Sequence, residues 1–125
     1  MAHEVNFDHV RRAIADFGPL ASVITVADTL RPHVVTAQVG VEGETLVAEI
    51  GSTTRANLAA RPDLALVWYP PGDGEYQLIL DGTVEHVGGP RDDGLSTVRI
   101  GVVGGILHRL AGLPGDAPSC RSLRD

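Results

Sequence analysis

The chain has 125 residues, of which 43% are hydrophobic, and its formal net charge is −6. This length fits one domain that buries a core without disulfides, and the hydrophobic share argues against wholesale disorder. An acidic chain without a basic stripe is a poor nucleic-acid binder, because phosphate neutralisation supplies most of that affinity.

The N-terminal residues and the single cysteine bear on the compartment. The first six residues form neither a cationic stretch nor a long apolar run, so we expect no signal peptide, no transmembrane segment and no membrane partner. Cys120 excludes an intramolecular disulfide framework and suits a reducing compartment. A cytoplasmic location is therefore expected.

The first predicted element is a helix from about Phe7 to Phe17, with Asn6 as its N-cap and Gly18 just past its end. Its apolar residues recur at helical spacing and make one apolar face. Three strands rich in β-branched residues follow, and their connections are too short for parallel crossovers. These strands are predicted over Ala21 to Ala27, His33 to Val41 and Thr45 to Ile50.

The second half begins with a short predicted helix over Ser52 to Arg61, which Pro62 ends. Strands are then predicted over Leu64 to Tyr69 and Tyr76 to Val87, and Gly82 within the second predicts a bulge or a sharp bend. Ser96 to Arg109 predicts one or two strand segments that close the sheet, with a short helix from Gly105 to Ala111 as the alternative. Many short strands with two helices favour a small antiparallel barrel.

The segment Gly51 to Asn57 carries the main candidate chemistry. It follows a strand and opens a helix, where free backbone N–H groups and the helix dipole favour an anion. Three hydroxyl side chains in a row add donors, and Arg55 adds a guanidinium that grips phosphate with two bonds. An ordinary N-cap explains the same hydroxyls, so the spacing alone leaves both interpretations open.

Four strings in chain order carry a family resemblance. They are Leu30 to Val35, Gly51 to Val67, Leu80 to Glu85 and Gly105 to Arg109. The first three resemble the patterns G-R-P-H-x-V, S-R-K-x-x-N-L-x-x-x-P-x-V-A-L and V-x-G-x-A-E of the split-barrel flavin-binding superfamily. This is the superfamily of pyridoxamine 5'-phosphate oxidase and the deazaflavin (F420)-dependent reductases. The fourth resembles the closing strand of its short actinobacterial-type members.

The resemblance implies a mainly β (α+β) fold, a six-stranded antiparallel split β-barrel with two short flanking helices. This flavin-binding domain is expected over residues 1–113, with a flexible C-terminal tail over residues 114–125. The resemblance also implies a homodimer with FMN, or alternatively F420, at the subunit interface. It carries the phosphate role onto Ser52, Thr53, Thr54, Arg55 and Asn57. It places the isoalloxazine ring against Val34, Val35, Thr36 and Ala37, with Trp68 and Tyr69 near the groove.

Two departures from the family pattern narrow the function that the resemblance predicts for this chain. Thr54 stands where many members have the first of two basic residues, which leaves Arg55 as the one charge. The C-terminal Arg/His motif of true pyridoxamine phosphate oxidases has no counterpart, so that activity is not expected. The sequence therefore predicts an FMN- or F420-dependent oxidoreductase acting on an unknown small molecule. The alternative is a non-catalytic cofactor-binding or sequestering dimer with a degenerate site.

Three further interpretations stay open. The five histidines show no metal spacing, so no metal site is expected and no catalytic acid or base is identified. His33 either faces the cofactor or is an ordinary residue at a strand edge. Trp68 either forms a stacking platform or packs in the core or at the dimer interface.

Overall fold

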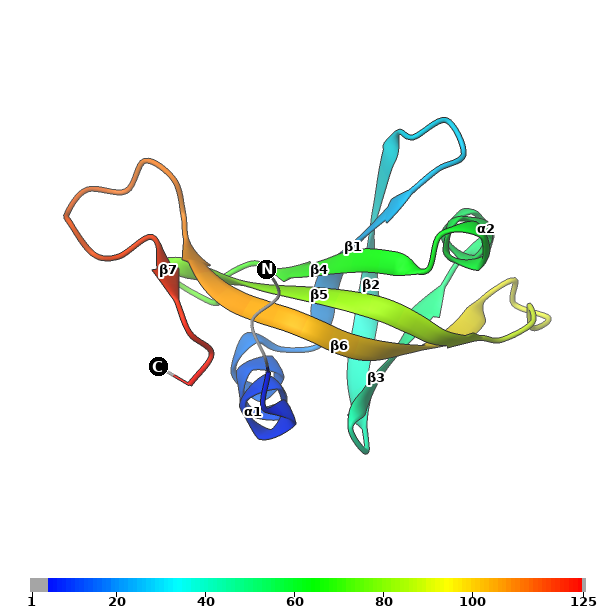
Figure 1. Cartoon of the computed structure of the whole chain (residues 1–125), viewed down its shortest axis with the longest axis horizontal. Coiled ribbons are helices and arrows are strands. Elements are labelled where there is room, and N and C mark those ends of the chain that lie inside the picture. The colour runs from blue at the N-terminus through cyan, green and yellow to red at the C-terminus, as the bar shows by residue number, and fades with distance from the viewer. Residues whose placement is uncertain (1–4, 125) are drawn as a thin grey trace.

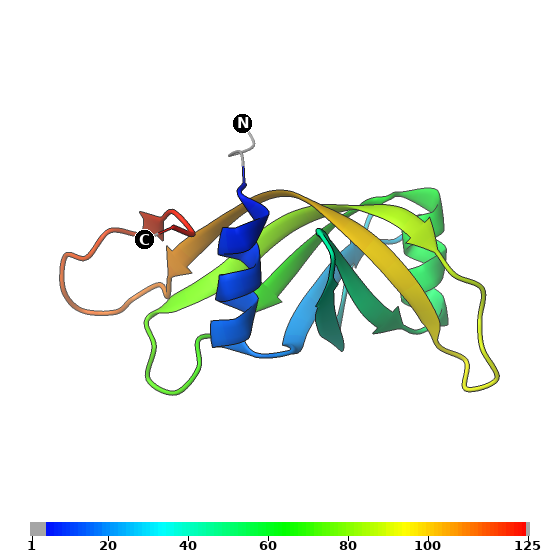
Figure 2. The ribbon, with the colours of Figure 1, turned by 90° about the horizontal axis from the view of Figure 1, so that it is seen from below.

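The computed structural model describes residues 5–124, which form two helices and seven strands (Figures 1 and 2). The elements in chain order are α1 (Phe7–Phe17), β1 (Leu20–Val26), β2 (Pro32–Glu42), β3 (Thr45–Ile50), α2 (Ser52–Ala60), β4 (Asp63–Trp68), β5 (Tyr76–Val87), β6 (Ser96–Arg109) and β7 (Cys120–Arg121). These bounds agree with the predicted bounds to within one or two residues, apart from β7.

Strands β1 to β6 close into an antiparallel barrel. They lie in the order β3-β2-β1-β4-β5-β6, and β3 pairs with β6 as well as with β2, which closes the ring. The predicted six-stranded antiparallel barrel with two helices is confirmed. Helices α1 and α2 lie well apart, on opposite sides of the barrel (Figure 1).

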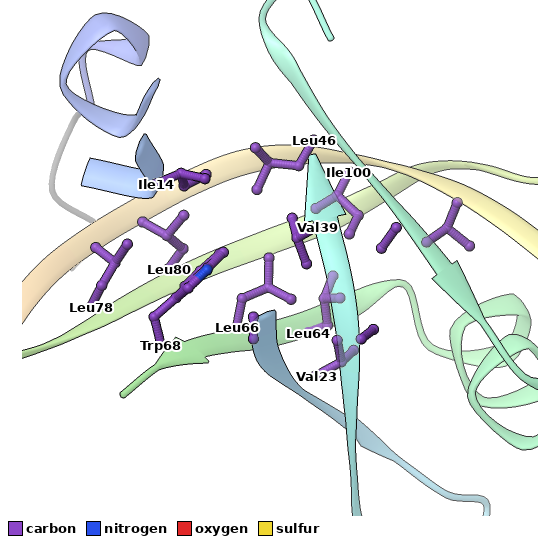
Figure 3. Packing of buried hydrophobic residues seen from close by; sticks show 14 of the residues in the cluster. Ile14, Val23, Val39, Leu46, Leu64, Leu66, Trp68, Leu78, Leu80 and Ile100 are labelled. Carbon is purple, nitrogen blue, oxygen red and sulfur yellow. The ribbon is translucent and has the colours of Figure 1, made fainter. Parts of the chain in front are cut away.

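The core fills the inside of the barrel with aliphatic side chains. Alternate residues of each strand point inward, so β4 alternates between buried and half-exposed positions. Trp68 is the largest fully buried side chain and lies beside Leu66 and Leu80 (Figure 3). Its indole Nε1 donates a hydrogen bond to the Gly18 carbonyl at 3.0 Å. This bond fastens the end of α1, which buries Val10 and two other residues against the core.

The long strand β5 bends where the sequence predicted it. The pairing of β5 with β6 shifts register between Asp81 and Gly82. A Cβ atom on Gly82 would lie 2.7 Å from Ile100 Cγ2 and 3.2 Å from the Gly101 carbonyl oxygen. Glycine at this position therefore lets β6 approach closely, and the predicted irregularity is confirmed.

Strand β6 runs unbroken to Arg109, so the alternative of a helix from Gly105 to Ala111 is wrong. Its second half pairs with β5 down to the register partners Arg109 and Tyr76. Glycine is a poor helix former. Pairing with β5 instead satisfies the backbone N–H and C=O groups of this half of β6.

The C-terminal segment, expected to be a flexible tail from residue 114, returns in part to the barrel. Strand β7 pairs with Leu107 and His108 of β6, and Leu123 packs against the core. The Arg109 side chain is only 11% exposed; it binds Glu75 at 2.7 Å and donates to two carbonyls of the loop, those of residues 113 and 114. These contacts hold a segment whose own sequence is rich in Pro, Gly and Ser.

At the far end of the β5–β6 hairpin, Arg91 ties the loop to β3. Its guanidinium donates to Glu49 at 2.8 Å, and this hydrogen bond raises the pKa of Arg91. The Leu95 backbone N–H donates to Asp93 and lowers the pKa of that carboxyl group. No helix within residues 5–124 is long and apolar enough to cross a membrane.

Replacing Gly82 with alanine tests the close approach of β5 and β6. We expect Gly82→Ala to lower the free energy of unfolding by about 1–3 kcal/mol, because the new methyl group has no room. Gly40→Ala is the matched control, since a Cβ there would lie an ordinary 3.7 Å from Val47. Urea unfolding checks both variants, and equal stabilities would contradict the packing described here.

Candidate functional site

The N-terminus of α2 is an uncapped helix end. Strand β3 delivers the chain to Gly51, the N-cap residue, which has extended backbone and no side chain to cap the helix. The first turn contains no acidic residue. The Arg55 backbone N–H is bonded to the Gly51 carbonyl at 3.0 Å, so the N–H groups of residues 52–54 precede the first full helical turn. These donors and the helix dipole make a positive local field.

The predicted phosphate-binding side chains divide into an outward and an inward group. Ser52 and Thr53 are exposed at the start of α2. Thr54 and Asn57 are 1% and 7% exposed and point into the barrel. Asn57 Nδ2 donates to Thr25 Oγ1 at 3.1 Å in a buried hydrogen bond. The structure therefore does not bring Thr54 and Asn57 to the surface with the others, and Asn57 fastens α2 to β1.

Arg55 lies between these two groups. Its side chain is half-buried, and its Nε atom is buried with no hydrogen-bond partner among the described residues. A buried cationic N–H without an acceptor costs more than about 1–3 kcal/mol, so the hydrogen-bonding capacity of the Arg55 guanidinium is not used up within the described residues. The orphaned donor is in the first turn of α2, where the backbone donors also lie.

The first half of β2 runs along an open edge. Residues 32–38 pair with β1, whereas β3 pairs only with residues 39–42 of β2. Their second backbone edge therefore has no strand partner in the described structure. Asn57 contacts Thr25, and the register partner of Thr25 on β2 is His33. The open edge thus begins at the end of the barrel that α2 covers.

The predicted ring-binding residues lie on this half of β2. Val34 is 58% exposed, and Thr36 is exposed on the same outer face. Val35 and Ala37 face inward, and Ala37 is buried. The Nδ1 atom of His33 is buried without a hydrogen-bond partner among the described residues. A ring placed here would meet the backbone edge and the outward side chains.

Trp68 does not join this site. It is fully buried in the core, and its indole N–H is already bonded to Gly18. Core packing, which the sequence left open, is therefore the role that the structure shows. Tyr69, the next residue, is 76% exposed just beyond the end of β4. Among residues 5–124, no group of three or more His, Cys, Asp or Glu side chains is placed to hold a metal ion.

Sequence reasoning missed a cavity of about 660 Å³ far from α2. It lies between the start of α1, the second half of β6 and the C-terminal segment, with Arg121 and Arg124 in its wall. The return of the C-terminal segment to β6 forms this cavity. No local sequence pattern marks that return, because the contacts come from Arg109 and from β7 pairing.

Comparisons with known proteins give relatives and structural neighbours. No family model matches the chain. Uncharacterized proteins of Mycobacterium bovis and Mycobacterium tuberculosis are each 36% identical to it, over 86% of this chain and 82% of the relative.

Three solved structures share the fold at low sequence identity. An F420 reductase has a TM-score of 0.64 at 15% identity, covering 75% of this chain and 94% of its own. A pyridoxamine 5'-phosphate oxidase-like protein of Listeria innocua has a TM-score of 0.65 at 13% identity, covering 81% and 96%. The heme storage protein HutZ of Vibrio cholerae has a TM-score of 0.61 at 15% identity, covering 78% and 92%.

These neighbours confirm the split barrel that the four sequence strings suggested. Proteins with this fold thus include both an F420 reductase and a heme storage protein. The chain therefore belongs to one family with the two mycobacterial proteins, and it has the split-barrel fold of the F420 reductase and of the pyridoxamine 5'-phosphate oxidase-like protein.

Proposed function

We propose that the chain binds a phosphorylated flavin-type cofactor, FMN or alternatively F420, and acts as an oxidoreductase on a small molecule. The observation that carries the proposal is the uncapped N-terminus of α2 with Arg55 in its first turn, whose buried Nε has no hydrogen-bond partner among the described residues. A phosphate at this end of the helix would meet the backbone N–H groups of residues 52–54 and the guanidinium of the half-buried Arg55 side chain. Ser52 and Thr53 would add hydroxyl donors from the exposed side of the turn.

The cofactor ring has a place that agrees with this phosphate position. The open edge of β2 begins at the end of the barrel that α2 covers, and Val34 and Thr36 present outward side chains there. A ring against this edge would use the backbone groups that lack a strand partner. The cofactor would supply hydride transfer, and the protein would bind and orient it. This activity is proposed for the cytoplasm, in keeping with one unpaired cysteine.

The alternative function is a cofactor-holding protein without turnover. Thr54 is a neutral, buried residue, and Arg55 is the one cationic side chain in the first turn of α2. The heme storage neighbour shows that a protein of this fold can hold a cofactor as its purpose. Bound cofactor without turnover of any small-molecule substrate would favour this alternative.

We further propose that two copies of the chain form a homodimer through the outer face of the sheet. Two rows of apolar side chains cross this face by strand pairing, and neither row is in the buried core. One row is Val34, Ile24 and Ala65, and the other is Val67, Ile79 and Ile106. The open edge of β2 borders this face, so a partner subunit there would stand next to the bound ring.

Loss of the Arg55 charge tests the phosphate position. We expect Arg55→Gln to weaken FMN or F420 binding by about tenfold or more, because a charge-assisted hydrogen bond is lost. Arg61→Gln is the matched control, since Arg61 follows the same helix and forms an exposed ion pair with Asp28. Fluorescence titration with FMN and with F420 measures the affinities of both variants. Equal losses in both variants would contradict the assignment.

Replacing Asn57 separates support of the helix from ligand binding. We expect Asn57→Ala to lower the free energy of unfolding by about 1–3 kcal/mol, because it leaves the buried Thr25 hydroxyl without its donor. Arg55→Gln should leave stability almost unchanged. Chemical denaturation without cofactor distinguishes the two variants. An Asn57→Ala protein with wild-type stability would show that the inward hydrogen bond is unimportant.

The dimer is tested by placing a charge on the outer face. We expect the protein to elute at twice the 13.2 kDa of one chain, and Val34→Glu to elute as a monomer. Val34 is already 58% exposed in one chain, so the variant should still fold. Leu95→Glu is the control, because Leu95 is an exposed apolar residue in the β5–β6 loop. A wild-type monomer, or a Val34→Glu dimer, would contradict this interface.

A further inference from the structure

The cavity beside α1 is a second concave site with its own chemistry. Its volume of about 660 Å³ lies within the range of small-molecule sites. One wall comes from the first turn of α1, a second from Gly105 and Ile106 of β6, and a third from residues 120–124. The start of α1 and strand β7, which line it, lie across the barrel from α2 (Figure 1), so it is separate from the proposed phosphate position within one chain.

The charges around this cavity have one sign. Its described ionisable lining groups are His9, Arg121 and Arg124, together with the Cys120 thiol, and no described carboxylate lines it. Asp8 in the same turn of α1 is directed to Arg11 at 2.7 Å and does not line the cavity. In a chain with a net charge of −6, a cavity wall with two arginines and no described acid favours an anion.

The two arginines are held by different means. The Arg121 guanidinium stacks 5.1 Å from the centre of the Tyr76 ring, and β7 pairing fixes its backbone. Arg124 is exposed, and its backbone N–H donates to the Ser122 hydroxyl at 3.4 Å. A guanidinium keeps its charge and several N–H donors when it also contacts a protein group. Both positive charges therefore contribute to the field in the cavity.

The floor of the cavity is apolar. Val5 and Leu123 line it, and Leu123 lies against Gly105, where a Cβ atom would be 3.0 Å from Leu123 Cδ1. Because Gly105 has no side chain, the Leu123 side chain can pack against it. An apolar floor below a cationic rim suits a ligand with a hydrocarbon or ring body and one anionic group.

We propose that this cavity binds a small organic anion, with its carboxylate, sulfonate or phosphate group at Arg121 and Arg124 and its apolar body on the floor. This proposal stands whether or not the chain binds a flavin-type cofactor. It assigns a function to the C-terminal segment, since that segment supplies both arginines. Without the return of β7 to β6, the cavity would lack its cationic wall.

Two fluorescent probes of nearly the same shape test the proposal. 8-Anilino-1-naphthalenesulfonate carries a sulfonate, and N-phenyl-1-naphthylamine has the same rings without the charge. We expect saturable binding of the sulfonate at one site per chain, about tenfold tighter than the neutral probe, as one charge-assisted contact supplies. Amide shifts in a 15N-labelled sample should concentrate at residues 105–106 and 120–124. Equal affinity for both probes, or shifts centred on the outer faces of β1 and β2, would overturn the proposal.

Variants of the exposed Arg124 complete the test without disturbing the core. We expect Arg124→Gln to weaken binding of the sulfonate probe by about fivefold or more, and Arg124→Lys to retain most of it. Arg12→Gln on the exposed side of α1 controls for the change in net charge, and Arg55→Gln controls for binding at α2. Both controls should bind the probe as the wild type does. An unaffected Arg124→Gln protein, or an equal loss in either control, would refute the cavity as the anion site.

Discussion

The structure depends on strand β3, whose pairing shifts from β2 to β6 along its length. Its first residues pair with β2, and its last residues, Glu49 and Ile50, pair only with β6. This exchange closes the barrel and leaves residues 32–38 of β2 with an unpaired edge. It also directs the chain into α2 at the end of the barrel where that edge begins. The candidate site is therefore a consequence of how the barrel closes.

Helix α2 is fixed from one side and available from the other. Thr54, Asn57 and Leu58 are buried, and the bond from Asn57 to Thr25 joins the helix to β1. These inward contacts hold the first turn in place without using its backbone donors. Arg55 lies at the boundary between the buried and the exposed side of the helix, and its buried Nε has no hydrogen-bond partner among residues 5–124. A helix fixed in this way presents prearranged donors, so an anion would meet them without a large cost in ordering the chain.

Much of the fold was predictable from local patterns. Runs rich in β-branched residues located the first strands, turn residues separated them, and Gly82 indicated the bend in β5. The phosphate segment was found from its place between a strand and a helix. The direction of each side chain was not predictable in this segment, since Thr54 and Asn57 face the barrel only because α2 packs at this angle.

The remaining features depend on contacts between residues far apart in the chain. Trp68 was expected near a groove, but the alternation of β4 and its bond to Gly18 place it in the core. The C-terminal segment has the composition of a loose tail, yet Arg109 and β7 draw it to the barrel and create the cationic cavity. Neither outcome follows from a window of sequence, because the partners lie on other elements.

The phosphate position at α2 is the central claim, and ligands that differ only in their phosphate test it most directly. Isothermal titration of the wild-type protein with FMN and riboflavin compares the same ring with and without the phosphate group. F420 and its deazaflavin chromophore, which lacks the phosphate together with the side chain attached through it, give a second comparison for the deazaflavin. The account predicts that one phosphorylated ligand binds at least about tenfold more tightly than its phosphate-free counterpart. Equal affinities within each pair, or no binding of either phosphorylated ligand, would contradict it.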